Sequence, residues 1–310
     1  MDFGKLSDIS KVNFDLPPDA SQTTALLQRH ATQIGQQKPI IYIGCTGWAM
    51  KEWVGKTYPP KAKSNDFLLH YGKQFNTIEL NTTHYRTPSV QNCEDWYAKT
   101  PADFRFAPKM LQNVSHTTDL GMNTGLAQSF IDAILHLKAK NGICFMQLPP
   151  HFKTKNLSIL ETFLKKYAHQ TPLAIEVRHE EWFENSNYGN LLFELLENYN
   201  VSTVITDVSG RRDVLHQRLT TSTAVIRFVG NALHPTDYTR IQAWVQRLKI
   251  WCLNGLEKVY FFTHEPDNLL APELALFVYD EIQKIIDIDF QPICRKPIFF
   301  DEQPKQFSLF

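Results

Sequence analysis

The segments LAIEVR at residues 173–178 and VSTVITD at residues 201–207 decide the fold class, together with the residues between them. Both segments are apolar or β-branched at nearly every position, which is typical of strands buried on both faces. Between them, four leucines within residues 191–196 recur with the i, i+3, i+4 spacing of an amphipathic helix. A strand, a helix and a second strand in this order predict a parallel strand pair joined by a right-handed crossover.

The same alternation extends along most of the chain. Eight strands are predicted, at residues 40–46, 77–81, 105–109, 142–148, 173–178, 201–207, 224–230 and 258–265. Helical spacing lies between them, for example at residues 67–71, 130–137, 157–164 and 241–251. Eight such units predict a closed (β/α)8 barrel of the TIM type over residues 40–290. An open doubly wound sheet is the alternative, but no GxGxxG pattern follows the first strand.

Both ends of the chain lie outside the predicted barrel. Residues 1–39 contain prolines and a polar stretch, and we expect an extension with one short helix. Residues 291–310 carry Pro292, Pro297 and Pro304, which favour an extended tail.

The composition excludes several classes of protein. The 310 residues carry 32 Lys and Arg against 32 Asp and Glu, so the chain is not a polycation that coats nucleic acid. No apolar run approaches the ~18 residues of a membrane span, and no basic region followed by an apolar core opens the chain. The five cysteines are far apart and show no CxxC spacing. We therefore expect a cytoplasmic protein with reduced cysteines and no membrane contact.

Polar side chains gather at the carboxyl ends of the predicted strands, where (β/α)8 barrels carry their reacting groups. Two carboxylates in one barrel mouth can act as general acid and base, with a histidine and an aspartate beside them. The catalytic candidates are Glu79, Glu176, His179 and Asp207.

The remaining candidates are ligand-binding residues at the strand ends and in the loops that follow. Aromatic and arginine side chains in such loops can stack on a base or a sugar. The ligand-binding candidates are Asn81, Tyr85, Arg86, Lys109, Gln147, Arg178, Trp182, Arg227 and His264.

Three of these candidates, Lys109, Arg178 and Arg227, are cations, which favours an anionic small molecule or nucleic acid as partner. The structural alternative is a layer of salt bridges in which they pair with the two glutamates. A divalent metal is a weaker alternative because the chain has no local signature such as HExxH, so we expect no cofactor. The metal ligands would come from Glu176, His179, Asp207 and His264.

Six motifs along the chain resemble those of one known family. They are IGCTGW at 43–48, TIELNTTHYR at 77–86, FRFAPK at 104–109, FMQLPP at 145–150, IEVRH at 175–179 and IRFVG at 226–230. In this order they are similar to the motifs of the YecE-like family, domain of unknown function 72. The resemblance spans residues 40–285 and implies a TIM-type barrel, but no activity. At the level of the fold, such barrels are similar to sugar-phosphate isomerases and to endonucleases that act on damaged DNA.

The chain departs from the family pattern at three positions. His84 stands where the family usually has Phe, and Val229 stands where a His is usual. In the eighth strand, His264 takes the place of a polar amide.

The last five residues, QFSLF at 306–310, resemble the peptide that binds the bacterial DNA sliding clamp. In that pattern Gln306 is the polar anchor, and Leu309 and Phe310 enter an apolar pocket. The alternative is that the phenylalanines of the tail fold back over the barrel.

Three functional hypotheses follow. The first is a barrel that binds a phosphate-bearing ligand, a nucleotide or damaged nucleic acid, in a role linked to DNA repair. The second is an enzyme similar to sugar or sugar-phosphate isomerases. The third is a non-catalytic accessory factor recruited to the sliding clamp. The residues alone do not select one reaction, and a hydrolase or an isomerase would both use such carboxylates.

Overall fold

The computed structural model describes residues 4–35, 37–183, 187–285 and 288–290. The predicted tail at residues 291–310, with Gln306, Leu309 and Phe310, lies outside the described residues.

All eight predicted strands are confirmed, each within two residues of its predicted bounds. They are β1 (Ile40–Gly44), β2 (Thr77–Leu80), β3 (Arg105–Pro108), β4 (Cys144–Gln147), β5 (Leu173–Glu176), β6 (Ser202–Asp207), β7 (Thr223–Val229) and β8 (Lys258–His264). Every pairing is parallel. Six strands form one sheet in the order β1-β8-β7-β6-β5-β4, and β2 pairs with β3 in a second sheet. The fold class is therefore α/β with parallel strands, as predicted.

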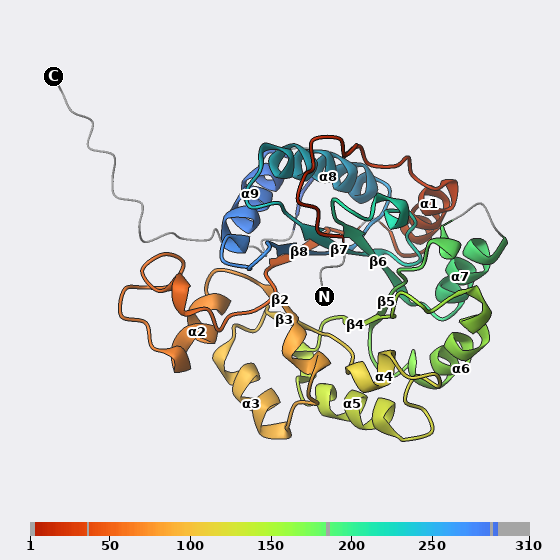
Figure 1. The fold of residues 1–310 in the computed structure, drawn as a ribbon, viewed down its shortest axis with the longest axis horizontal. Helices are drawn as coiled ribbons and strands as arrows, with labels where there is room; N and C mark the ends of the chain where they lie inside the picture. The colour runs from red at the N-terminus through yellow and green to blue at the C-terminus, as the bar shows by residue number, and fades with distance from the viewer. Residues whose placement is uncertain (1–3, 36, 184–186, 286–287, 291–310) are drawn as a thin grey trace.

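Backbone hydrogen bonds also cross the two junctions between these sheets. Between β3 and β4, Gly142 N donates to Phe106 O at 2.8 Å and Met110 N donates to Phe145 O at 2.9 Å. Between β1 and β2, Glu79 N donates to the carbonyl oxygen of Cys45, the residue after β1, at 3.0 Å. The eight strands thus surround the centre of the view in Figure 1.

Helices surround the strands on the outside (Figure 1). In the described part of the chain they are α1 (Ser21–Ile34), α2 (Phe67–Gly72), α3 (Val90–Lys99), α4 (Gln112–Ser115), α5 (Leu126–Leu135), α6 (Leu157–Tyr167), α7 (Asn187–Asn198), α8 (Pro235–Leu253) and α9 (Ala271–Gln283). The larger apolar core includes buried residues of both strands and helices. A smaller cluster, the inner cluster, consists of strand residues and their neighbours: Tyr42, Ala107, Ile143, Phe145, Ala174, Val204, Val225, Tyr260 and Phe262.

The structure departs from the predicted alternation of strands and helices between β6 and β7. Only the short 3-10 helix η7 (Arg212–Val214) lies there, with no α-helix. Residues 208–222 include Gly210 and a run of Thr and Ser, and they lack the apolar spacing of an amphipathic helix.

The N-terminal helix α1 occupies the place in the ring between α7 and α8 (Figure 1). Thr23 Oγ1 donates to Gln217 O at 2.9 Å and accepts from Leu219 N at 3.0 Å, so α1 docks on the segment that lacks its own helix. Arg29 lies 3.6 Å from Glu197 of α7. The predicted extension therefore contributes one of the outer helices.

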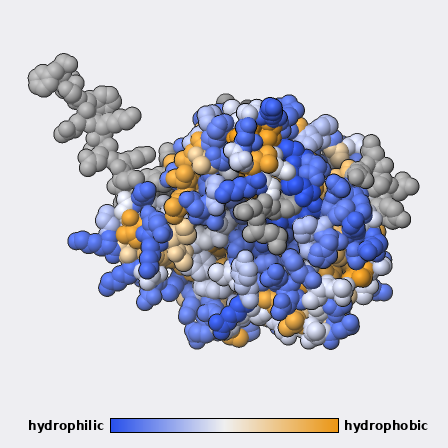
Figure 2. Space-filling view, viewed as in Figure 1, coloured by the Kyte–Doolittle hydropathy of each residue, from blue (hydrophilic) through white to orange (hydrophobic). Residues whose placement is uncertain are grey.

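The surface and the thiols agree with the composition. No helix of the described segments has the length and apolarity needed to cross a bilayer. The face shown in Figure 2 is mostly hydrophilic, with apolar residues in small separate patches. Cys45, Cys93, Cys144 and Cys252 are buried free thiols, and Cys294 lies outside the described residues.

Candidate functional site

Strand alternation decides which side chains reach the centre of the strand ring at its carboxyl end. Residues two apart in a strand share a face. Ala174 and Val225 belong to the inner cluster, so Glu176 and Arg227 lie on the same face one step further along. The same step from an inner-cluster residue leads to a polar residue on most strands: Lys109, Gln147, Glu176, Thr206, Arg227 and His264. These residues make the carboxyl end of the ring a polar mouth.

The floor of this mouth is a buried layer of two carboxylates and two guanidinium groups. Arg227 donates twice to Glu79, from Nε and Nη2 at 2.9 Å each, and from Nη1 to Glu176 at 2.9 Å. Arg178 Nε donates to the other oxygen of Glu176 at 2.7 Å. All four side chains are buried. These four side chains therefore form the layer of salt bridges that was expected as the structural alternative to a ligand site.

The electrostatics of this layer keep both glutamates ionised. Burial alone would raise the pKa of Glu176, but Arg178 and Arg227 outweigh it and lower the pKa to about 2. Burial opposes ionisation of Glu79 in the same way, yet Arg227 and His264 hold its pKa well below the usual range. A carboxylate of such low pKa takes up no proton near neutral pH.

Three neutral groups complete the layer. Asn81 Nδ2 donates to Glu79 Oε1 at 2.9 Å, and Arg178 Nη2 donates to Gln147 Oε1 at 2.7 Å. His264 Nε2 lies 2.9 Å from Glu79 Oε2, so this nitrogen carries the proton and donates it to the carboxylate. Burial lowers the pKa of His264 although Glu79 opposes the shift.

Lys109 differs from the other cations of the mouth. Its side chain is only 9% exposed, and the described residues give its Nζ no hydrogen-bond or ion-pair partner. Nζ lies 6.0 Å from the centre of the Phe145 ring. Burial, followed by the charge of Arg227, lowers the pKa of Lys109 to about 8. The mouth thus holds three cations against two carboxylates, and among the described residues Lys109 is the one of these cations without a direct ion pair, although Glu79 and Glu176 attract it at longer range.

A cavity of about 280 Å³ opens above this layer. Its lining comes from the ends of β3 to β8 and the loops that follow β2, β3 and β6: His84, Tyr85, Lys109, Gln112, His116, Gln147, Arg178, Thr206, Val208, Arg227, Val229 and His264. We call it the mouth cavity. Tyr85 stands at its rim, 77% exposed.

Two histidines of the mouth cavity were not among the predicted site residues. His84 Nδ1 donates to Met110 O at 2.7 Å, and burial lowers the pKa of His84 to about 4. The His116 ring lies 5.6 Å from that of His84, and burial lowers its pKa as well. Both imidazoles are therefore neutral at neutral pH. His84 was visible in the sequence as a departure from the family pattern, but no local signal pointed to His116.

The structure places Asp207 away from the mouth cavity. Asp207 accepts hydrogen bonds from Arg240 Nη2 and Trp244 Nε1, both at 2.7 Å on α8, and from Arg212. It follows Thr206, which lines the mouth cavity, so strand alternation turns Asp207 toward the outer helices. The sequence predicted that Asp207 lies at the end of a strand, but not that its side chain lies on the outer face of that strand.

Three further predicted residues belong neither to the buried layer nor to the lining of the mouth cavity. Trp182 is buried and its Nε1 donates to Phe152 O at 2.9 Å. His179 Nδ1 accepts from Glu181 N at 3.2 Å and caps the 3-10 helix η6 (Glu180–Trp182). Arg86 is exposed on the surface after β2.

The described side chains offer no group of three or more His, Cys, Asp or Glu residues that could hold a metal ion. The four candidate metal ligands are divided between different places, since Glu176 and Asp207 are bound by arginines on opposite sides of the strands.

Comparisons with known proteins agree with these motifs. The family model for a protein of unknown function, DUF72, matches residues 42–292. UPF0759 protein YecE of Escherichia coli K12 is 28% identical over 265 residues, which cover 80% of this chain and 94% of that protein. UPF0759 protein YunF of Bacillus subtilis 168 is 29% identical over 163 residues, 49% of this chain and 56% of that protein.

Solved structures of the same family share the fold. A DUF72 family protein from Enterococcus faecalis V583 matches with a TM-score of 0.62 and 16% identity, over 84% of this chain and all of that chain. One from Thermotoga maritima MSB8 matches with a TM-score of 0.59 and 23% identity, over 79% of this chain and all of that chain. Because the family model covers most of its length, the chain belongs to the DUF72 family of proteins of unknown function.

Proposed function

We propose that the mouth cavity binds a small ligand through an anionic group, such as the phosphate of a nucleotide or a sugar phosphate. One observation carries this proposal: Lys109 is a buried cation at the wall of the mouth cavity, and no described residue forms a direct ion pair with it. An unpaired buried charge costs free energy, and an anion beside Nζ removes that cost. The same anion would find Arg178 and Arg227 on the lining.

In this proposal the two glutamates position the arginine side chains of the site. Glu79 and Glu176 fix the planes of Arg227 and Arg178 through charge-assisted hydrogen bonds of 2.7–2.9 Å. Because both stay ionised near neutral pH, they serve poorly as general acids. Their two negative charges offset two of the three cations, so the mouth keeps one excess positive charge, which suits one small anion.

A second candidate function is a sugar-phosphate isomerase-like reaction. It is favoured by Lys109, whose pKa of about 8 allows proton exchange near neutral pH, and by the neutral imidazoles of His84 and His116 in the same cavity. In this reading the proton-transfer groups are these three residues rather than the predicted carboxylates.

We further propose that the two sheets close into a complete (β/α)8 barrel, with α1 as the outer helix between α7 and α8. The backbone hydrogen bonds at the β1–β2 and β3–β4 junctions support this architecture. A closed barrel would explain why the side chains of β2 and β7 meet, as Glu79 and Arg227 do.

Lys109→Met tests the anion-binding proposal, because it keeps the apolar stem and removes the charge. Titration calorimetry with inorganic phosphate should show at least a ~10-fold weaker affinity, about 1.4 kcal/mol. The matched control is Lys51→Met, an exposed lysine outside the mouth cavity, which should bind like the wild type. Equal phosphate affinity in wild type and Lys109→Met, or no binding to wild type at ~10 mM, would contradict the proposal.

We also propose that the C-terminal peptide recruits the protein to a bacterial sliding clamp, as an accessory factor in the cytoplasm. The support is its sequence, since Gln, Ser, Leu and Phe at four set positions arise by chance on the order of 10⁻⁵ per window. A full-length Leu309→Ala, Phe310→Ala double variant should lose binding to a purified clamp, while Lys305→Ala should keep it. No binding by wild type at ~100 μM sinks the idea.

A further inference from the structure

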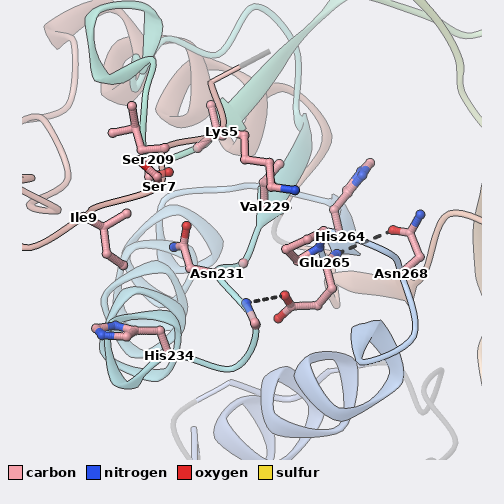
Figure 3. A pocket seen from close by; sticks show the side chains of 15 residues that line it. Lys5, Ser7, Ile9, Ser209, Val229, Asn231, His234, His264, Glu265 and Asn268 are labelled. Atoms are coloured by element: carbon pink, nitrogen blue, oxygen red, sulfur yellow. Dashed lines mark hydrogen bonds between the residues drawn. The ribbon is translucent and has the colours of Figure 1, made fainter. Parts of the chain in front are cut away.

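A second cavity of about 510 Å³ adjoins the mouth cavity (Figure 3). Val208, Val229 and His264 line both cavities, so the two are neighbours across these side chains. One wall of the second cavity is the N-terminal segment, and the other walls are the loops after β6, β7 and β8. Both volumes together are of the size that small-molecule sites occupy in proteins.

The loop after β7 explains why this second cavity is unsuited to a phosphate. In many (β/α)8 enzymes the phosphate lies at the loops after strands 7 and 8, held by backbone N–H groups. Here the buried carboxylate of Glu265 fills that place, because Ala232 N donates to Oε2 at 2.8 Å and Leu233 N to Oε1 at 3.3 Å. Figure 3 shows the first of these bonds. The usual phosphate position is therefore taken by the protein's own carboxyl group, whose pKa is raised by burial to about 7.

The lining of the second cavity combines one lysine with neutral polar side chains, which suits a hydroxyl-bearing group. Lys5, Ser7, Asn231 and Asn268 bring hydrogen-bonding side chains, and Figure 3 shows Lys5 extending toward Val229 and His264. Apolar surface comes from Leu6, Ile9, Val208, Val229 and Pro266. The rings in this lining are the imidazoles of His234 and His264, and Phe, Tyr and Trp are absent from it, so it offers a nucleobase little aromatic surface for stacking.

We propose that the two cavities together form one site for a sugar phosphate, with the phosphate beside Lys109 and the sugar hydroxyls in the second cavity. This inference rests on the proposed anion-binding function and adds the ligand class and its orientation. The sugar end is read by side chains of the N-terminal segment, which lies before the residues that the family model matches. Gly4 O accepts from Gly210 N at 2.8 Å and fixes this segment over the loop after β6.

Titration calorimetry with two probes tests the inference. Inorganic phosphate measures the mouth cavity alone, and ribose 5-phosphate measures both cavities. Wild type should bind ribose 5-phosphate at least ~10-fold more tightly than phosphate, since added hydrogen bonds each contribute to affinity. Ser7→Trp, which fills the second cavity, should remove this preference and leave phosphate affinity unchanged. Lys5→Ala should reduce the preference for ribose 5-phosphate about 3-fold to 10-fold.

Lys11→Ala is the matched control, because Lys11 is an exposed lysine of the same segment that does not line the second cavity. It should bind both probes like the wild type. Phosphate binding with no preference for ribose 5-phosphate, or a preference that survives in Ser7→Trp, would overturn the inference and leave the anion site standing. A preference for adenosine 5′-monophosphate over ribose 5-phosphate that Ser7→Trp removes would overturn the assignment to a sugar. Failure of both probes to bind would instead overturn the proposed function.

Discussion

Two buried clusters of charge lie on the inner and the outer side of the strands, and they come from different strands. On the inner face, Arg178 and Arg227 bind Glu79 and Glu176 beside Lys109. On the outer face, under α8, the buried acids Asp207 and Asp237 bind Arg240 and Arg212. The outer cluster has two acids and two cations, whereas the inner one has two acids and three cations.

The difference shows which buried ion pairs point to a ligand. The outer cluster is balanced, and Trp244 donates a further hydrogen bond to Asp207, so this carboxylate is fully occupied by protein donors. The inner cluster lies beneath a cavity and has one cation in excess. A strand-end position and burial are common to both, so charge balance and access to a cavity are what separate the proposed binding site from a structural salt bridge.

The largest expected effect is on the stability of the inner cluster. Arg227→Met removes three of the hydrogen bonds that Glu79 and Glu176 accept and leaves two buried carboxylates under-compensated. Urea unfolding should show a loss of about 3–5 kcal/mol in the free energy of unfolding. Lys109→Met should show no such loss, because no direct ion pair of Lys109 is present among the described residues. A loss below ~1 kcal/mol in Arg227→Met would mean that the layer is not held by this arginine.

A somewhat smaller loss is expected in the outer cluster. Asp207→Asn keeps the shape of the side chain but withdraws the counter-charge from Arg240 and Arg212, which should cost about 2–3 kcal/mol. Phosphate affinity at native temperature should stay within ~2-fold of wild type, as Asp207 does not line the mouth cavity. If calorimetry finds a loss of affinity above ~10-fold, the division into a structural and a ligand-binding cluster fails.

The smallest expected effect is the pH dependence of anion affinity, which tests the role of Lys109. Lys109 is charged below its pKa of about 8 and neutral above it, so anion affinity should fall as pH rises through this value. A bound anion favours the charged form, which moves the loss to a higher pH. Sulfate is a suitable probe because its own charge is constant between pH 7 and 9.5. Its affinity should decline by up to ~10-fold in wild type and stay flat in Lys109→Met. Equal slopes in both proteins would assign the pH dependence to another group.

The strands could be predicted because they are buried on both faces and therefore apolar along their length. The polar mouth could be predicted for the same reason, since Glu176 and Arg227 interrupt apolar segments at their ends. Asp207 was assigned to the mouth because it also ends a strand. Counting in steps of two places it on the outer face only once Val204 is known to face inward, which the structure shows and the sequence does not.

Other features depend on contacts between distant segments. His116 enters the mouth cavity from the segment after β3, and the absence of a direct ion pair for Lys109 among the described residues depends on the side chains of several distant segments. The 3-10 segments and the position of α1 could not be read locally either. The helix pattern of residues 21–34 gives no information on which gap in the ring it fills.

The docking of α1 has a consequence for synthesis on the ribosome. Thr23 is made early, yet its partner Gln217 follows 194 residues later. At about 5–20 residues per second, the helix waits roughly 10–40 s after it is made before its binding place exists. During this interval Leu26 and Leu27, both buried in the native protein, have no surface to cover them. The nascent chain therefore presents the apolar side of α1 to chaperones during this interval, and α1 can dock only after the segment between β6 and β7 has left the exit tunnel.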